Sequence, residues 1–158
     1  MKKIVVLGGG YAGVLTAKKL AKKFKKDQDV SITLIDKQSY HTMLTELHEV
    51  AAGRVDEESI RMDLKKIFAG RKVDVVLDEI TLIDFEQKVL TSNSTKYDYD
   101  YLVMGTGCKP TFFGIPGSEN AHQLWSYTDA VNLREHILNM FRQAALTCDK
   151  EKRKELLT

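Results

Sequence analysis

The feature that most constrains this chain is a glycine-rich loop close to its N terminus. Gly8-x-Gly10-x-x-Gly13 follows a short apolar run at residues 4–7 and precedes apolar residues at helical spacing over residues 12–24. A second β-branched run, at residues 30–35, follows a polar turn. This order predicts a strand, a helix and a second strand, which in nearly all proteins form a right-handed parallel crossover.

Each glycine of the loop has a distinct physical role in such a unit. Gly8 permits the tight turn, Gly10 lets a pyrophosphate approach the backbone, and Gly13 allows the helix to pack closely on the strand. The amides and dipole at the start of the helix favour a phosphate anion. A glycine turn with a purely structural role could have the same three glycines. The strand before the loop and the helix after it are what favour a phosphate-binding role.

Asp36 ends the second predicted strand, 23 residues after Gly13. At that position its carboxylate can accept hydrogen bonds from both hydroxyls of an adenosine ribose, whereas it would repel a 2′-phosphate. The loop and the acid together predict a dinucleotide, FAD or NAD in preference to NADP, and they leave the choice between the two open.

The pattern changes after residue 77. The sequence predicts helices over residues 41–52 and 57–68 and a parallel-type strand over 73–77. Three short segments split by turn residues then indicate a small antiparallel meander, at residues 80–85, 88–91 and 96–98. A buried-type strand over 101–104 runs into Gly105-Thr106-Gly107. The predicted fold class is therefore α/β, a Rossmann-like doubly wound parallel sheet with a small antiparallel β-meander.

The C-terminal part predicts a long helix that ends near residue 146, with Thr128 or Asp129 as its N-cap. Residues 149–155 are interpreted as a solvated charged stretch. The net charge of +2 gives no general attraction to nucleic acid. No apolar run approaches the roughly 20 residues of a membrane-spanning helix. We therefore expect a cytoplasmic chain with no nucleic-acid partner and no metal site.

Two cysteines, Cys108 and Cys148, stand forty positions apart and form no CxxC pair. Both are expected to be free thiols, and Cys108 is expected to be buried or half-buried. His41 and His48 are interpreted as packing or helix-surface histidines, because no ligand cluster surrounds them. The lysine-rich stretch over residues 18–26 is interpreted as the solvated face of a helix, with contact to anionic lipid as the alternative.

The order of loop, meander and Gly-Thr-Gly strand end resembles the glutathione-reductase-type flavoproteins that bind two dinucleotides. Residues 40–53, Tyr-His-Thr-Met-Leu-Thr-Glu-Leu-His-Glu-Val-Ala-Ala-Gly, are similar to the segment after the second strand of bacterial type II NADH:quinone oxidoreductases. Residues 99–107 and 112–117, the latter Phe-Phe-Gly-Ile-Pro-Gly, resemble them too. The resemblance covers nearly the whole chain.

The resemblance implies FAD as cofactor, NADH as substrate and a quinone as electron acceptor, with hydride passing to the flavin and no catalytic side chain in this segment. It places Thr45 beside the isoalloxazine ring, Ile80 near the adenine, and Thr106 and Gly107 near the pyrophosphate or adenosine. The full set of expected cofactor-binding residues is Gly8, Gly10, Tyr11, Ala12, Gly13, Asp36, Lys37, Thr45, Ile80, Thr106 and Gly107.

Three parts of the resembled family have no counterpart here: a second glycine fingerprint, a later strand ending in Gly-Asp, and a C-terminal membrane-associating segment. Residues 1–158 are thus expected to be the N-terminal part of a discontinuous FAD-binding domain, without the NADH-binding domain. We expect weak or absent FAD in the chain by itself, and self-association through the edge of strand 101–104 or an exposed helix. The full-length protein is expected to be peripheral on the cytoplasmic face of the membrane through that segment.

Two other functions remain open. A sulfide:quinone or ferredoxin-type flavoprotein reductase would keep the fold and change the electron partner. An NAD-sensing regulatory module of a transporter would share the glycine loop and the acid, but it should alternate strand and helix throughout.

Overall fold

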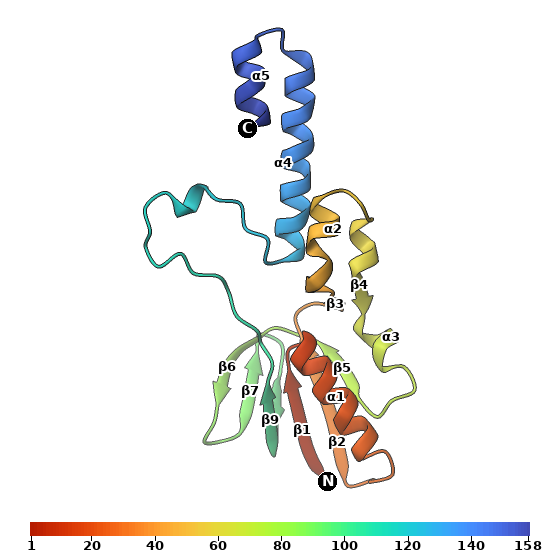
Figure 1. The fold of residues 1–158 in the computed structure, drawn as a ribbon. Helices are drawn as coiled ribbons and strands as arrows, with labels where there is room; N and C mark the ends of the chain where they lie inside the picture. The colour runs from red at the N-terminus through yellow and green to blue at the C-terminus, as the bar shows by residue number, and fades with distance from the viewer. The chain divides into compact units, whose positions relative to one another are not determined.

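The structure is a computed structural model that describes all of residues 1–158, and the chain folds into two compact units (Figure 1). The first unit contains residues 1–42 and 61–108, and the second contains residues 43–60 and 109–158.

A four-stranded parallel sheet forms the centre of the first unit. Its strand order is β5-β2-β1-β9. The strands are β1 (Lys2–Leu7), β2 (Val30–Asp36), β5 (Asp74–Leu77) and β9 (Tyr101–Met104). All four strands were predicted from their apolar runs, which are typical of strands covered on both faces. β9 lies at the edge of the sheet, as predicted, with Tyr101 and Met104 exposed.

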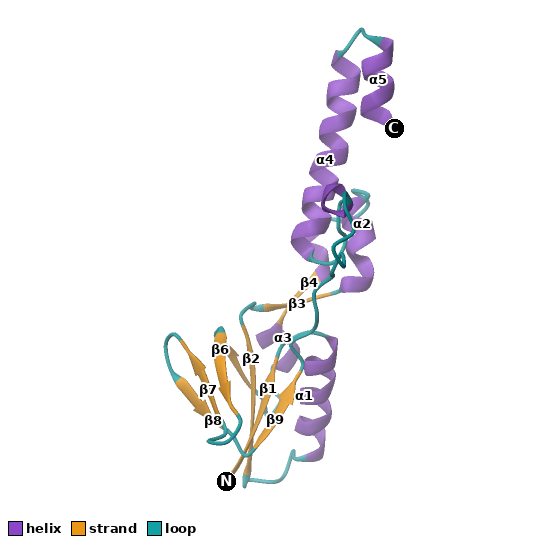
Figure 2. Cartoon of the chain, turned by 90° about the vertical axis from the view of Figure 1, so that its left-hand side faces the viewer, coloured by secondary structure: helices purple, strands orange, loops and turns teal.

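The two faces of the sheet are covered differently, as Figure 2 shows. On one face, helix α1 (Tyr11–Lys23) buries Val14 and Ala17 against Val6 and Leu34. Helix α3 (Leu64–Phe68) adds its own buried side chains to the same cluster. On the other face, Leu90 and Tyr99 pack against strand residues that point away from the helices. Successive side chains of each strand point to opposite faces of the sheet and thus contribute to two separate hydrophobic clusters.

The second face is covered by the meander that the turn residues predicted. Strands β6 (Ile80–Asp84), β7 (Val89–Ser92) and β8 (Lys96–Asp98) form a three-stranded antiparallel sheet in the order β6-β7-β8. The meander takes the place in the chain between β5 and β9 where a further crossover helix would stand in an uninterrupted alternation. The predicted fold class is therefore confirmed.

The prediction of two helices over residues 41–52 and 57–68 was right only in part, because a short strand occupies part of each range. Strand β3 (Tyr40–Thr42) pairs antiparallel with β4 (Arg61–Asp63). Helical structure is confined to η1 (Leu44–Glu46), α2 (Leu47–Ala51), η2 (Glu57–Ile60) and α3. Asp63 starts α3, because its carboxylate accepts a hydrogen bond from the Lys66 amide at 2.8 Å. Pairing between segments about twenty residues apart overrides the local helical periodicity.

The second unit is helical. Leu47, Val50 and Ala51 of α2 pack with Ile60 and with Ala130 of helix α4 (Tyr127–Leu146). A short 3₁₀ helix, η3 (Ser118–Asn120), precedes α4. Helix α5 (Lys150–Leu157) contacts α4, where the Arg153 Nε donates to the Ala144 carbonyl at 3.2 Å.

Two details of this unit differ from the prediction. The N-cap of α4 is Ser126 and not Thr128 or Asp129. Ser126 and Asp129 form a capping box, in which each side chain binds the backbone amide of the other residue. The charged stretch at residues 149–155 is exposed, as expected, but it is helical, because Asp149 caps α5.

Candidate functional site

The glycine loop lies at the carboxyl end of the parallel sheet, where the strand order reverses. From β1 the chain passes outward through β2 to β5 and then returns to place β9 on the opposite side of β1. The crevice outside the carboxyl ends of the strands at such a switch point is where open α/β sheets bind ligands. The loops after β1 and β9 flank this point, and they contain Gly8 and Gly105.

Gly8 and Gly105 hold the two loops in close contact. Gly8 has a φ of +105°, in the region that favours glycine, and a Cβ there would lie 2.2 Å from the Gly105 carbonyl oxygen. The Gly8 amide donates to the Ile35 carbonyl at 2.8 Å, and the Gly105 amide donates to the Leu7 carbonyl at 2.7 Å. These contacts thus tie together the carboxyl ends of β2, β1 and β9.

Gly13 and Gly10 differ in what surrounds them. A Cβ on Gly13 would lie 1.8 Å from the Gly8 carbonyl oxygen, so glycine is required for α1 to start against the strand end. A Cβ on Gly10 would meet nothing within 4 Å, and its φ of −73° is open to any residue. No contact inside the chain therefore requires glycine at position 10.

The N terminus of α1 has no side-chain cap. Gly10 is its N-cap residue, and the first turn contains no acidic side chain. Tyr11 and Ala12, both expected to bind the cofactor, are exposed in this first turn. The first amides of a helix have no partners within it, and the helix dipole makes this end positive. An anion at this position would supply the missing hydrogen-bond acceptors.

Asp36 is the half-buried last residue of β2. Its Oδ2 accepts a hydrogen bond from the Gly9 amide, and its Oδ1 accepts one from the Gln38 amide at 2.6 Å. The carboxylate thereby fixes the glycine loop as well as its own turn. A carboxylate has about four lone-pair sites, so two amide donors leave capacity for further hydroxyl donors.

His41 is part of the site in a way that sequence reasoning missed. It is buried on β3, and its Nδ1 lies 2.9 Å from the Gly9 carbonyl oxygen, which makes Nδ1 the donor. Its ring meets Tyr11 edge-on, with centroids 4.7 Å apart. The interpretation of His41 as a packing histidine is confirmed, although it lies on a strand. His48 is exposed, with its Nε2 2.9 Å from Glu49 Oε1.

Gly9 was also absent from the expected site. A Cβ there would lie 2.8 Å from Leu64 Cδ1 and 3.2 Å from Asp36 Oδ2. The three consecutive glycines at 8–10 were the available signal. Glycine at this position lets the Leu64 side chain of α3 and the Asp36 carboxylate lie close to the loop.

The other expected residues of the first unit lie at the same end of the sheet. Lys37 is exposed and its Nζ lies 3.5 Å from Glu79 Oε1. Ile80 opens β6 and packs against the cluster under the meander. Thr106 and Gly107 are exposed after β9. Thr45 belongs to the second unit, where it is exposed on η1 and donates to Glu46 Oε1 at 3.4 Å.

Asp78, whose backbone amide pairs with Asp36, forms a hydrogen-bond network of its own. The Asp78 amide donates to the Asp36 carbonyl at 3.0 Å, and Asp78 Oδ2 accepts from the Tyr97 hydroxyl at 2.6 Å and from Ser94 at 3.0 Å. The Tyr97 hydrogen bond is the main cause that lowers the pKa of Asp78 to about 2. The same bond raises the pKa of Tyr97 to about 12. This network ties β5 to the meander.

Cys108 and Cys148 are free thiols, as expected. The expectation that Cys108 is buried or half-buried was wrong, because it is exposed in the stretch that follows Gly107. No group of three or more potential ligands could hold a metal ion. None of the helices is both long enough and apolar enough to cross a membrane.

The family model for pyridine nucleotide-disulphide oxidoreductases matches residues 2–147, which include the glycine loop, Asp36, the meander and β9. The chain belongs to the pyridine nucleotide-disulphide oxidoreductase family. This membership, together with the meander, argues against a transporter's regulatory module, in which strand and helix should alternate without interruption.

Among the relatives of this family member is the type II NADH:quinone oxidoreductase of Staphylococcus haemolyticus, which is 37% identical over 151 residues. The corresponding enzyme of Staphylococcus aureus is 36% identical over 151 residues. These alignments cover 95% of this chain and 37% of each relative, so the chain spans little more than a third of their length.

Solved structures give the same fold. The sulfide:quinone oxidoreductase of Aquifex aeolicus superposes with a TM-score of 0.78 at 26% identity, covering 90% of this chain and 33% of that one. NDH2 from Plasmodium falciparum superposes with a TM-score of 0.79 at 24% identity, covering 97% and 32%. The resemblance read from the motifs is confirmed.

Proposed function

We propose that this chain binds FAD through the ADP half of the cofactor, as part of an oxidoreductase that passes electrons from NADH to a quinone. One observation carries the proposal. At the switch point of the sheet, Gly8 and Gly13 are required by contacts inside the chain, whereas the side of Gly10 is open next to an uncapped helix N terminus. A pyrophosphate is the group that would use both features.

The residues present fit the adenosine end of such a cofactor. Asp36 would accept hydrogen bonds from the ribose hydroxyls, with its carboxylate already oriented by the Gly9 and Gln38 amides. Its charge disfavours a 2′-phosphate. Residues around Lys37, Ile80, Thr106 and Gly107 lie at the same carboxyl end of the sheet and would line the adenosine and pyrophosphate. Thr45 is assigned to the flavin end by the resemblance alone.

FAD is favoured over NAD by the meander and by the relatives. The meander interrupts the alternation that a plain NAD domain would continue. The Staphylococcus relatives are named NADH:quinone oxidoreductases. Bound flavin supplies the hydride and electron chemistry between the two substrates. This segment's own contribution is to hold and orient the cofactor, and we assign no catalytic side chain to it. We also propose that the enzyme acts as a peripheral protein at the cytoplasmic face of the membrane.

Cofactor binding is tested by titrating the chain with FAD, ADP and NADP and following flavin fluorescence and heat. We expect weak, saturable FAD binding that ADP displaces, and poorer binding of NADP. Asp36→Asn should weaken FAD binding about tenfold, the scale of one lost charged hydrogen bond. Asp74→Asn, an exposed acid at the opposite end of the sheet, is the matched control. Equal FAD affinity in the two variants would remove Asp36 from the site.

The activity is tested by replacing the matched segment of the Staphylococcus haemolyticus enzyme with this chain. The chimera should retain flavin and reduce a quinone with NADH. If the chimera folds and binds flavin but is inactive with NADH and quinone, the proposed electron donor and acceptor are wrong.

A sulfide:quinone reductase is the second candidate. The similarity to the Aquifex aeolicus enzyme and the exposed thiol of Cys108 after Gly107 favour it. Reduction of bound flavin by sulfide, lost in Cys108→Ser, would support this candidate. Cys148→Ser, the other exposed thiol, is its control.

A further inference from the structure

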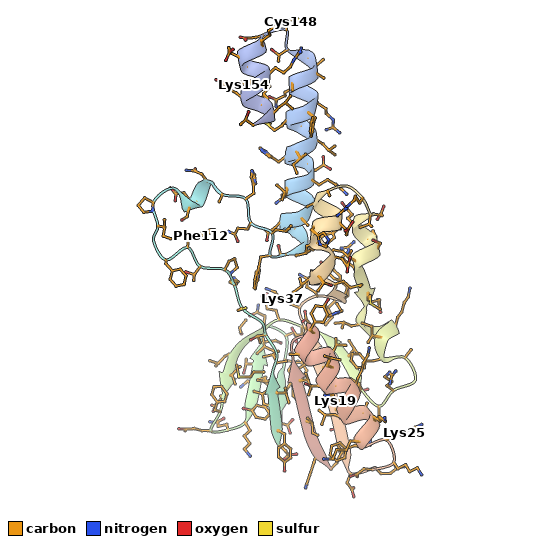
Figure 3. All side chains as sticks on the ribbon, viewed as in Figure 1. Lys19, Lys25, Lys37, Phe112, Cys148 and Lys154 are labelled. Carbon is orange, nitrogen blue, oxygen red and sulfur yellow. The ribbon has the colours of Figure 1, made fainter.

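A groove lies between the later turns of α1 and the stretch before β5, within the first unit. Its volume is about 400 Å³. Nine residues line it, none of them acidic, and six are cationic: Lys18, Lys19, Lys22, Lys25, Arg71 and Lys72. Figure 3 labels Lys19 on this helix and Lys25 in the turn that follows it. Segments about fifty residues apart in the sequence are thus brought together to concentrate positive charge.

The charge in the groove is not neutralised within the chain. The net charge of the whole chain is only +2, yet α1 contains no acidic residue. Lys18, Lys19, Lys22, Lys25 and Arg71 form no ion pair with any carboxylate, and Lys72 donates to the Asp27 carbonyl. Lysines three and four residues apart on a helix repel one another. An ordinary solvated face would intersperse the two signs.

A neighbouring hollow of about 430 Å³ shares Lys25, Arg71 and Lys72 with the groove. It differs in containing Asp27 and Asp74. The unbalanced charge is therefore concentrated in the first groove and on the rim that the two hollows share. This localisation distinguishes the groove from a uniformly basic surface.

The groove is also separate from the glycine loop. The loop lies at the N terminus of α1, and the groove follows the later turns of this 13-residue helix. At 1.5 Å per residue the helix is about 20 Å long. Both places attract anions by different means: the loop offers backbone amides, and the groove offers side-chain ammonium and guanidinium groups.

We propose that this groove binds an anion that carries two or more phosphate groups. Its volume is in the range of small-molecule sites, about 300–1,000 Å³. Six cations exceed what one phosphate would neutralise, and lysine and arginine are the ordinary phosphate-binding side chains. A soluble polyphosphate and a clustered lipid headgroup share this chemistry. Leu15, 56% exposed on the lining, gives an apolar contact beside the cations. The proposal is independent of the cofactor assignment at the loop.

The test is calorimetric titration of the full chain with inorganic tripolyphosphate, without ADP, because the two phosphates of ADP would compete for the groove. A variant combining Lys18→Gln, Lys22→Gln and Arg71→Gln should bind at least about tenfold more weakly, as expected for the loss of three ion pairs. The matched control combines Lys65→Gln, Lys66→Gln and Lys96→Gln, which removes the same charge from exposed positions outside the groove. Binding by this control should change less than about threefold, and thermal unfolding should show both variants folded.

The source of the phosphate is distinguished by a second arm. Sedimentation with vesicles of anionic phospholipid, against phosphatidylcholine vesicles, measures headgroup binding. Vesicle binding lost in the groove variant assigns a lipid headgroup, and tripolyphosphate binding without vesicle binding assigns a soluble ligand. Equal weakening in both triple variants, no effect of the groove variant, or binding of neither probe would overturn the proposal.

Discussion

The two ends of the parallel sheet use polar groups in opposite ways. At the carboxyl end, Asp36, His41 and Asp78 are all hydrogen-bonded within the chain, and what faces outward is backbone around Gly10. At the amino end, the cations of the groove have no carboxylate partners. Side chains thus build a rigid frame at one end and remain available for a ligand at the other.

The two ends of the sheet should respond differently to mutation. A change to a residue that holds the loops together at the carboxyl end should act first on folding, whereas a change on the open side of Gly10 should act on binding. A change at the amino end should act on binding and salt sensitivity, with little loss of stability. Four substitutions test this division.

Gly13→Ala should have the largest effect on stability of the four substitutions. The new Cβ would lie 1.8 Å from the Gly8 carbonyl oxygen, so the helix start must move off the strand end. We expect a loss of about 3 kcal/mol or more in the free energy of unfolding, at the upper end for overpacked sites. Chemical denaturation measures it. If the variant keeps wild-type stability, the loop and the helix can shift apart at little cost in free energy.

Gly10→Ala makes the matched comparison three residues earlier. Its Cβ would meet nothing, and the backbone conformation suits alanine, so the stability cost should stay below about 1 kcal/mol. FAD affinity should nevertheless fall about tenfold, because the methyl group stands where the pyrophosphate would approach. Flavin fluorescence titration measures the change. If the variant binds FAD as tightly as the wild type does, the cofactor does not approach the open side of Gly10.

The contrast between these two glycines also shows what a sequence can predict. The roles of Gly8 in the turn, of Gly13 in close helix packing and of Gly10 in leaving one side of the loop open follow from the local pattern of strand, turn and helix. The contact of Gly8 with Gly105 could not be predicted in this way, because it depends on β9 lying beside β1. The contacts of Gly9 with His41 and Leu64 were missed for the same reason, since they depend on β3 and α3 lying beside the loop.

Longer segments follow the same rule. The four parallel strands and the meander were predictable, because apolar runs and turn residues are local signals. Residues 40–68 were predictable only in part, because the pairing of β3 with β4 depends on contacts between segments about twenty residues apart. At α4, the cap Ser126 lies one turn before Asp129, and the acid is its partner in the capping box. Asp129 was predicted as a possible N-cap residue, whereas it is the third residue of the helix.

Tyr97→Phe tests the frame at the carboxyl end through its pH dependence. The lowered pKa of Asp78 means that the network stabilises the fold above pH 4, and that this contribution is lost as pH falls from about 4 to about 2. The raised pKa of Tyr97 means that the contribution is also lost as pH rises from about 10 to about 12. The stability difference between wild type and variant should therefore be largest between these limits and fade at both ends.

Tyr101→Phe is the control for this profile, because Tyr101 is exposed on β9 and takes no part in the Asp78 network. Urea unfolding across the pH range measures both variants. A constant difference for Tyr97→Phe at all pH values would mean that the hydroxyl acts only through packing, and the frame would then not depend on the Asp78 charge.

Lys19→Glu should have the smallest effect on stability, and in the opposite direction. At this exposed position the substitution replaces repulsion from Lys22 and Lys23 by attraction at helical spacings of three and four residues. Such pairs contribute about 0.2–0.5 kcal/mol each, so the chain should become more stable by about 0.5 kcal/mol at low salt, and the gain should fade as salt is added. Tripolyphosphate binding should weaken in the same variant. If Lys19→Glu gains stability and loses tripolyphosphate binding, the lysines of the groove serve binding at a cost in stability. If the variant loses both, the lysines of the groove stabilise the fold, as the polar groups at the carboxyl end do.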